Sequence, residues 1–188
     1  MNILLEGFSQ HLTIAGFRDV RIENVDRFFQ TVKDETGNAC VQFFNASLVA
    51  GGEHLRFAAL NALNAFKSKI NISSNLAMET LLYASAQRQI KEAVKAIGIK
   101  PNIGRVAVLV LTENCKQAST VLKVVSKLMG GRRDDSVVDL SDDKMADLKR
   151  LFEISNVELR AKEDRPDAEK QALADLVIEH MALLVTQR

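Results

Sequence analysis

Residues 105–112 read Arg-Val-Ala-Val-Leu-Val-Leu-Thr, and this run is the strongest strand signal in the chain. Its near-continuous content of β-branched residues and leucine is typical of a strand that is covered on both faces. A shorter β-type run occupies residues 40–44, and a brief third one occupies residues 137–140. These three segments predict a small sheet in which residues 105–112 are buried.

Apolar residues at helical spacing account for most of the remaining chain. Asn24 and Asn75 each precede such a pattern and are predicted N-caps, because a short polar side chain accepts a hydrogen bond from the first turn. Ser141 is a third N-cap candidate, and Pro166 opens the last helix. The predicted helices cover residues 25–36, 53–68, 76–86, 90–97, 116–129, 142–152 and 168–186.

Together these patterns predict a single α+β domain over residues 1–188, with a small, mainly antiparallel sheet surrounded by about six to eight helices. The chain has 188 residues, of which 47% are apolar, so it can bury a real core. No run approaches the roughly 18 uninterrupted apolar residues of a membrane-spanning helix, and the first residues lack the pattern of a secretion signal. We therefore expect a cytoplasmic protein without membrane contact.

Motifs for catalysis or metal binding are not evident in the sequence. Cys40 and Cys115 lie in apolar segments without the paired spacing of a zinc site, so both are expected to be reduced thiols buried in the core. His11, His54 and His180 are widely separated, and none has a second ligand one helical turn away. Because the glycines lack phosphate-loop spacing and no nucleophile motif occurs, we expect neither an enzyme nor a bound metal or cofactor.

A series of motifs runs through the chain in a specific order. They are Phe44-Asn45-Ala46, Glu53-His54-Leu55, Asn71-Ile72-Ser73-Ser74-Asn75-Leu76, Glu79-Thr80-Leu81-Leu82, Arg88-Gln89-Ile90, Ile97-Gly98-Ile99 and the closing segments 147–155 and 176–184. In order and spacing they resemble the kinase-associated regulatory subunit of the KEOPS complex, the family of the PRPK-binding protein, in its archaeal form. One departure is that Ala86-Gln87 stand where many relatives have a glycine that breaks the helix. A straighter or differently kinked helix is expected there, and the orientation of Arg88 depends on it.

The resemblance implies a non-catalytic role in the threonylcarbamoyladenosine modification of tRNA. Members of the family bind the small atypical kinase/ATPase subunit of the complex, and archaeal relatives also bind tRNA and hold its 3′ CCA tail. The absence of a catalytic motif in this sequence agrees with such a role. A protein-docking regulator of a kinase, without direct RNA contact, is the alternative reading.

The charge distribution bears on the tRNA expectation. The net charge is only +1, but residues 1–52 hold 4 basic and 6 acidic side chains, residues 53–133 hold 13 and 4, and residues 134–188 hold 8 and 14. Phosphate binding depends on local charge, so the basic middle segment permits RNA binding, although an ordinary solvated face has the same composition. The residues predicted to contact tRNA are Lys67, Lys69, Asn71, Asn75, Arg88 and Lys91.

The last predicted helix is apolar around most of its circumference. Such a helix is either deeply buried or docks a partner, and both readings fit this pattern. The resemblance favours docking of the kinase for Ile178, Met181 and Leu184. The same docking surface would allow a homodimer of the isolated chain.

Overall fold

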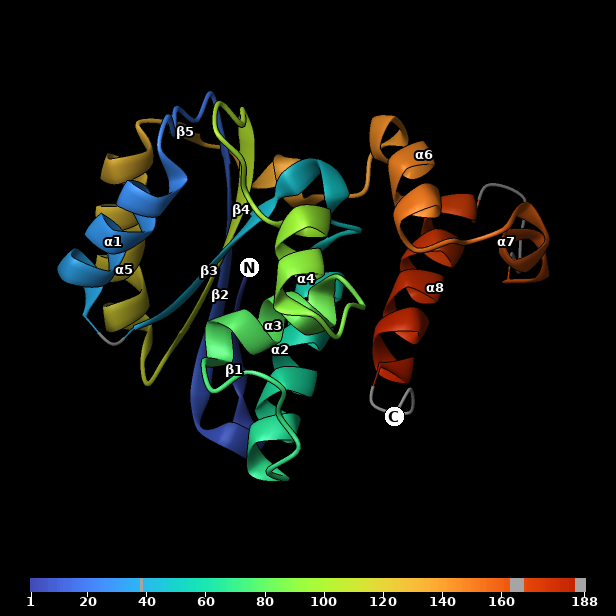
Figure 1. Cartoon of the computed structure of the whole chain (residues 1–188), viewed down its shortest axis with the longest axis horizontal. Coiled ribbons are helices and arrows are strands. Elements are labelled where there is room, and N and C mark those ends of the chain that lie inside the picture. The colour runs from blue at the N-terminus through green and yellow to red at the C-terminus, as the bar shows by residue number, and fades with distance from the viewer. Residues whose placement is uncertain (38, 163–167, 185–188) are drawn as a thin grey trace. The chain divides into compact units, whose positions relative to one another are not determined.

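The computed structural model describes residues 1–37, 39–162 and 168–184 and confirms the α+β class (Figure 1). These described residues form eight α-helices and an antiparallel sheet of five strands. Contacts divide the chain into two compact units, each built from two separate stretches. Unit 1 comprises Met1–Ser47 and Gly98–Val138, and unit 2 comprises Leu48–Ile97 and Asp139–Arg188. The single domain expected over residues 1–188 stays a prediction.

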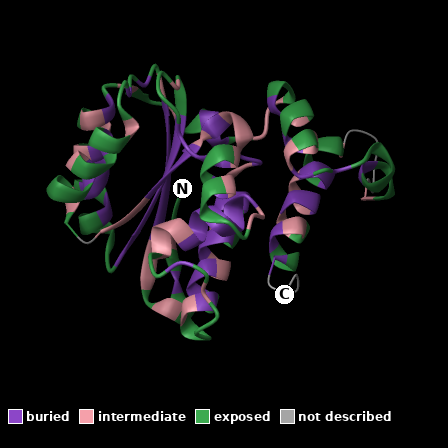
Figure 2. Cartoon of the chain, in the orientation of Figure 1, coloured by how far each residue is buried: buried purple, intermediate pink, exposed green. Residues whose placement is uncertain are grey.

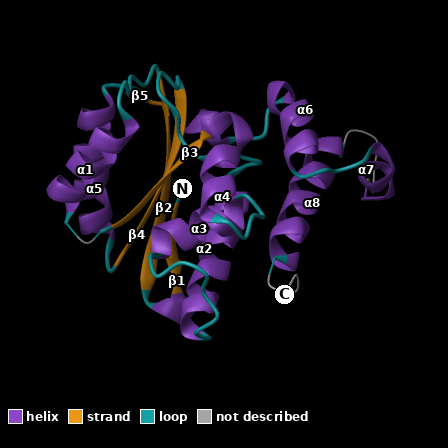
Figure 3. Cartoon of the chain, in the orientation of Figure 1, coloured by secondary structure: helices purple, strands orange, loops and turns teal. Residues whose placement is uncertain are grey.

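Unit 1 contains the sheet, and its strands are orange in Figure 3. Strand β4 (Arg105–Thr112) pairs with β2 (Gln10–Arg18) on one side and β3 (Cys40–Asn45) on the other, and β1 (Asn2–Leu5) and β5 (Arg132–Arg133) both pair with β2. The predicted strands at residues 40–44 and 105–112 are confirmed. Residues 106–112 are all buried (Figure 2). Since successive side chains point to opposite faces of a sheet, both faces of β4 are covered, as its apolar run predicted.

Two helices, α1 (Val25–Thr36) and α5 (Cys115–Met129), pack against each other and complete the main core of unit 1 (Figure 1). Phe28 of α1 meets Phe43 of β3 edge to face, with ring centroids 5.0 Å apart. Asn24 caps α1, since its Oδ1 accepts a hydrogen bond from the Arg27 amide at 2.9 Å, as predicted.

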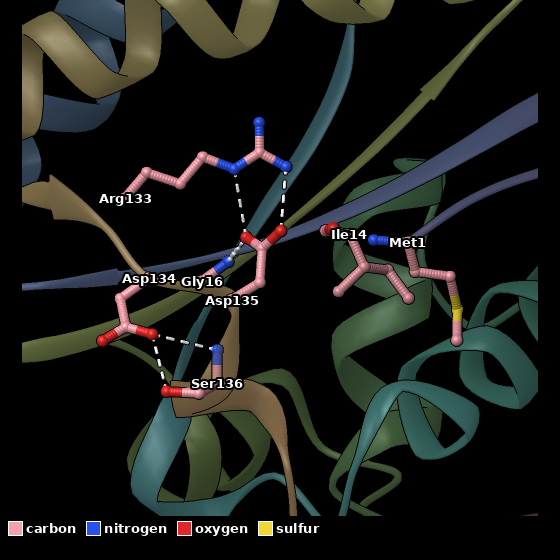
Figure 4. A network of polar contacts seen from close by, with 7 residues as sticks. All are labelled: Met1, Ile14, Gly16, Arg133, Asp134, Asp135 and Ser136. Carbon is pink, nitrogen blue, oxygen red and sulfur yellow. Dashed lines mark hydrogen bonds and ion pairs between the residues drawn. The ribbon is translucent and has the colours of Figure 1, made fainter.

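The strand predicted at residues 137–140 is wrong. Residues Asp135–Val138 form a 3₁₀ helix, η3, which packs on β2 at Gly16. Asp135 anchors it, because its Oδ1 accepts hydrogen bonds from the Gly16 amide at 3.0 Å and from Arg133 Nε at 3.1 Å (Figure 4). A Cβ at Gly16 would lie 2.4 Å from the carbonyl oxygen of Asp134, so the missing side chain permits this close approach.

Unit 2 is helical in its described residues (Figure 3). Its helices are α2 (Gly52–Lys67), α3 (Leu76–Ala84), α4 (Ile90–Ile97), α6 (Asp142–Leu151), α7 (Asn156–Lys162) and α8 (Glu169–Leu183). All except α7 were predicted. Asn75 caps α3 through the Met78 amide, as predicted. Ser141 occupies the predicted N-cap position of α6, but its hydroxyl donates to Asp143 and does not accept a hydrogen bond from a main-chain amide. Pro166 and the last residues of the predicted terminal helix lie outside the described residues.

The expectation that both cysteines are buried in the core is wrong for Cys115, whereas Cys40 is half-buried. Cys115 is exposed, because it is the first residue of α5 at one end of the sheet. Cys40 lies on β3, where burial raises the pKa of its thiol to about 12. Among the described residues, no helix combines the length and the apolar character needed to cross a membrane.

Candidate functional site

All residues predicted to contact tRNA lie in unit 2. Arg88 and Lys91 lie just before α4 and in its first turn, whereas Lys67 ends α2 and Lys69, Asn71 and Asn75 lie in the connection between α2 and α3. This connection, residues 68–75, is held by the buried carboxylate of Glu79 on α3. The carboxylate accepts hydrogen bonds from the amides of Ile72 and Ser73, the latter at 2.7 Å. A buried acceptor that receives main-chain amides fixes the loop and leaves its other side chains at the surface. Lys67, Lys69 and Asn75 are exposed there.

The two asparagines of this connection also have structural roles. Asn71 is half-buried, and its Nδ2 donates to the carbonyl oxygen of Ser73 at 3.0 Å. The side chain of Asn75 caps α3, so one of its polar atoms is already engaged. Substituting either asparagine would therefore alter the loop as well as any RNA contact.

The helix break before Arg88 is kept without glycine. Helix α3 ends at Ala84, and Ala86 adopts the left-handed conformation with φ of +51°. The amides of Ala86 and Gln87 donate to the carbonyl oxygens of Tyr83 and Leu82, which is the hydrogen-bond pattern of a Schellman motif. Of the two expected alternatives, the straighter helix is wrong, because the capping bonds end α3 and hold alanine where glycine is usual. A differently kinked helix stays a prediction.

Arg88 is exposed in the turn that follows, and Lys91 is exposed on the first turn of α4. The Arg88 guanidinium lies close enough to affect the hydroxyl of Tyr83. Burial and the charge of Glu79 raise the pKa of Tyr83, and the positive charge of Arg88 acts in the opposite direction. The positive charge of Arg88 therefore acts on the buried end of α3.

Aliphatic side chains are exposed among these cations. Ile70 and Ile72 follow Lys69 in the connection, and Ile90 and Val94 flank Lys91 on α4. Each of the four aliphatic side chains is about 40% exposed or slightly more. Cations for phosphates beside apolar surface for bases are the combination that single-stranded nucleic acids require, although here the apolar part is aliphatic and not aromatic.

The basic excess seen in the sequence is divided between the two units. Of the 13 basic side chains in residues 53–133, 6 lie in residues 53–97 of unit 2, against 3 acidic ones. The other 7 lie in residues 98–133 of unit 1, against Glu113 alone. The charge near the predicted tRNA residues is therefore smaller than the sequence total indicates.

Helix α8 carries the residues predicted to dock a kinase. Met181 and Leu184 are buried, whereas Ile178 is half-buried and Leu183 is 52% exposed. The two interpretations of this apolar helix, deep burial and docking of a partner, therefore apply to different residues. Burial accounts for Met181 and Leu184, and Ile178 is the member of the predicted set that a partner can reach.

Ile178 lines a cavity of about 480 Å³ within unit 2. The start of α2 forms one side through Gly52 and Phe57, and the α8 residues Ala174 and Ile178 form another. The lining combines apolar side chains with three carboxylates and one lysine. The charged lining residues are Glu53, Asp139, Lys170 and Asp175. The cavity is not evident from the sequence, because its walls come from three separate stretches of the chain.

A buried histidine holds the main chain that leads into this cavity. His54 Nδ1 accepts a hydrogen bond from the Ala50 amide at 3.1 Å, and Nε2 lies 2.8 Å from the carbonyl oxygen of Ala84, to which it donates. Burial, together with the charge of Lys144, lowers the pKa of His54 to about 4, although the bond to Ala84 opposes the shift. The neutral imidazole therefore links the start of α2 to the end of α3.

Comparisons with known proteins identify the family. The model of the family described as "Kinase binding protein CGI-121" matches residues 17–184. The chain belongs to this CGI-121 family. It is also 36% identical over 143 residues to the "Regulatory protein Cgi121" of Methanocaldococcus jannaschii, a match that covers 76% of this chain and 85% of the relative.

Membership of the CGI-121 family confirms the resemblance seen in the sequence. The family match includes the connection between α2 and α3, the turn at Arg88 and the whole of α8. The cavity at Ile178 therefore belongs to a member of a family that is described as kinase-binding. No group of three or more potential metal ligands occurs among the described residues.

Proposed function

We propose that this chain is a non-catalytic regulatory subunit of the KEOPS complex that binds the kinase/ATPase subunit through the cavity at Ile178. The observation that supports it most directly is the accessible Ile178 beside the start of α2, in a chain whose family is described as kinase-binding. The partner surface would present an apolar side chain to Phe57 and Ile178 and a cationic one to the surrounding carboxylates. Met181 and Leu184 support α8 from inside, so direct contact is proposed for Ile178.

The kinase contact is tested by Ile178→Glu. A carboxylate at this position would be desolvated by the partner and would lie among three existing carboxylates. We expect the dissociation constant for the co-expressed KEOPS kinase to rise at least about thirtyfold, or about 2 kcal/mol, in isothermal titration calorimetry. Val157→Glu on α7 is the matched control, because Val157 is 78% exposed and lies outside the cavity. Equal affinity of Ile178→Glu and the wild type would refute this placement.

We further propose that tRNA, through its 3′ CCA tail, contacts the cations of unit 2. Lys67, Lys69, Arg88 and Lys91 would bind phosphates, and the exposed isoleucines beside them would contact bases. Glu79 supports this role by holding the connection in one conformation. Asn71 and Asn75 would act chiefly by shaping that connection.

The double variant Arg88→Glu/Lys91→Glu tests the tRNA contact. Each phosphate contact contributes about 0.7 to 0.9 to the slope of log affinity against log salt concentration, so losing two should reduce the slope by about 1.5. The control is Lys123→Glu/Lys127→Glu on α5, which changes the net charge by the same amount. This control variant should bind tRNA more tightly than Arg88→Glu/Lys91→Glu does. An unchanged affinity and salt slope for Arg88→Glu/Lys91→Glu would leave the docking regulator without RNA contact as the function.

A further inference from the structure

The turn between β4 and α5 brings a thiol and an imidazole together in unit 1. Thr112 Oγ1 donates to the carbonyl oxygen of Asn114 at 3.1 Å, and Asn114 caps α5 through the Gln117 amide. Cys115 follows as the first residue of α5. His11 lies opposite Thr112 in the β2–β4 register, so the turn places the thiol beside this imidazole. Cys115 Sγ is 3.1 Å from His11 Nδ1.

Two further polar side chains belong to the same corner of the sheet. Asn2 on β1 lies opposite Thr13, and its Oδ1 is 3.8 Å from Cys115 Sγ. Thr13 is two residues from His11 on β2, so both side chains lie on the same face of the sheet. Thr13 is only 6% exposed, and its Oγ1 has no hydrogen-bond partner among the described residues. A buried hydroxyl without a partner is unusual in a folded protein.

From this geometry we propose that Cys115 is a modification site that forms mixed disulfides with the disulfides of small thiols. His11 accepts the thiol proton, and the Cys115 sulfur attacks one sulfur of the small disulfide. The new bond joins Cys115 to that sulfur, the original S–S bond breaks, and the released thiolate takes the proton from His11. Cys115 is oxidised and half of the small disulfide is reduced, so no further oxidant is needed.

The site is independent of the kinase and tRNA contacts proposed above, since none of its residues belongs to unit 2. The chain also provides an internal comparison. Cys40 lies in the same unit, but burial raises the pKa of its thiol to about 12 and keeps it protonated near neutral pH. We therefore expect one thiol of the two to react in the folded protein.

The experiment is reaction with dipyridyl disulfide at pH 7, followed by the absorbance of the released pyridinethione and by mass spectrometry of the labelled peptides. The wild type should release one equivalent rapidly and carry the label on Cys115. Cys115→Ser should abolish this phase, and His11→Gln should slow it about tenfold or more, the low end of what a removed general base costs. His180→Gln is the matched control and should leave the rate unchanged.

A second measurement does not depend on a variant that folds. In urea the thiol remains accessible but loses His11, so Cys115 of the wild type should react more slowly in the unfolded chain than in the folded one. A folded rate equal to or below the unfolded rate would overturn the proposal. The proposal would also be overturned if the wild type and folded His11→Gln reacted at equal rates across the pH range. Such a result would mean that the exposure of Cys115 alone explains its reactivity.

Discussion

Acidification should destabilise this fold through His54. Both ring nitrogens are used by the neutral imidazole, because Nδ1 accepts from the Ala50 amide while Nε2 donates to Ala84. Protonation would place a hydrogen on Nδ1 facing the Ala50 amide, in a fully buried site near Lys144. The folded protein therefore resists protonation, whereas the unfolded chain takes up a proton at the ordinary pKa.

The sign and size of the effect follow from the two pKa values. The pKa of His54 is lower in the folded protein than in the unfolded chain. Its contribution to stability is therefore fully present above pH 6.5 and is lost as the pH falls toward the folded-state pKa. With 6.5 in the unfolded chain and about 4 in the folded protein, the free energy of unfolding decreases by about 2 kcal/mol at pH 5 and about 3 kcal/mol at pH 4. For a chain of this size, the pH 5 loss corresponds to a melting temperature lower by about 4 to 8 °C.

The assay is urea denaturation at pH 7.5 and pH 5 for the wild type, His54→Gln and His180→Gln. The loss between the two pH values should shrink by about 2 kcal/mol in His54→Gln and persist in His180→Gln. The same loss in His54→Gln as in the wild type would refute the reasoning. If His54→Gln does not fold, the ring resonances of His54 in the wild type decide the matter, because they should stay constant down to pH 5. A shift of those resonances between pH 7 and pH 6 would contradict the buried neutral state.

Two backbone predictions concern single methyl groups. Ala86→Gly should raise the free energy of unfolding by about 0.5 to 1 kcal/mol in urea denaturation, because relief of the left-handed strain exceeds the extra freedom of glycine in the unfolded chain. A lower urea midpoint would contradict it. Gly16→Ala should lower the free energy of unfolding by about 2 kcal/mol or more, since the new Cβ would lie 2.4 Å from the Asp134 carbonyl oxygen and 2.6 Å from Val137 Cγ2. Gly7→Ala is its control, because nothing lies within 4 Å of a Cβ there, and equal stability of the two variants would exclude the steric explanation.

Strong local patterns were readable from the sequence. The near-continuous apolar run at residues 105–112 and the helical spacing of apolar residues in most of the helices are local signals, which tertiary packing only reinforces. The first strands were not predicted, because β2 is buried on both faces, is interrupted by Gly16, and pairs with residues about ninety positions away. The polar seven-residue α7 has little apolar pattern of its own.

The candidate site was predictable in part. Helical spacing identified Ile178, Met181 and Leu184 as apolar positions on one helix, but α8 is apolar on nearly every side, so spacing could not separate the accessible Ile178 from the other two. The cavity carboxylates come from distant stretches, and only the packing of unit 2 joins them. Likewise, the position of Cys115 beside His11 depends on the strand register.

The interleaving of the two units has a consequence for synthesis on the ribosome. Strand β3 pairs only with β4 in the described sheet, and β4 is completed 67 residues after β3 ends. At about 5 to 20 residues per second, translation leaves the β3 edge without its partner for about 3 to 13 s. An unpaired apolar strand edge is a template for association with other chains. A ribosome that stalls before Arg105 would thus hold a nascent chain with this edge exposed, which makes timely elongation through β4 a requirement for productive folding.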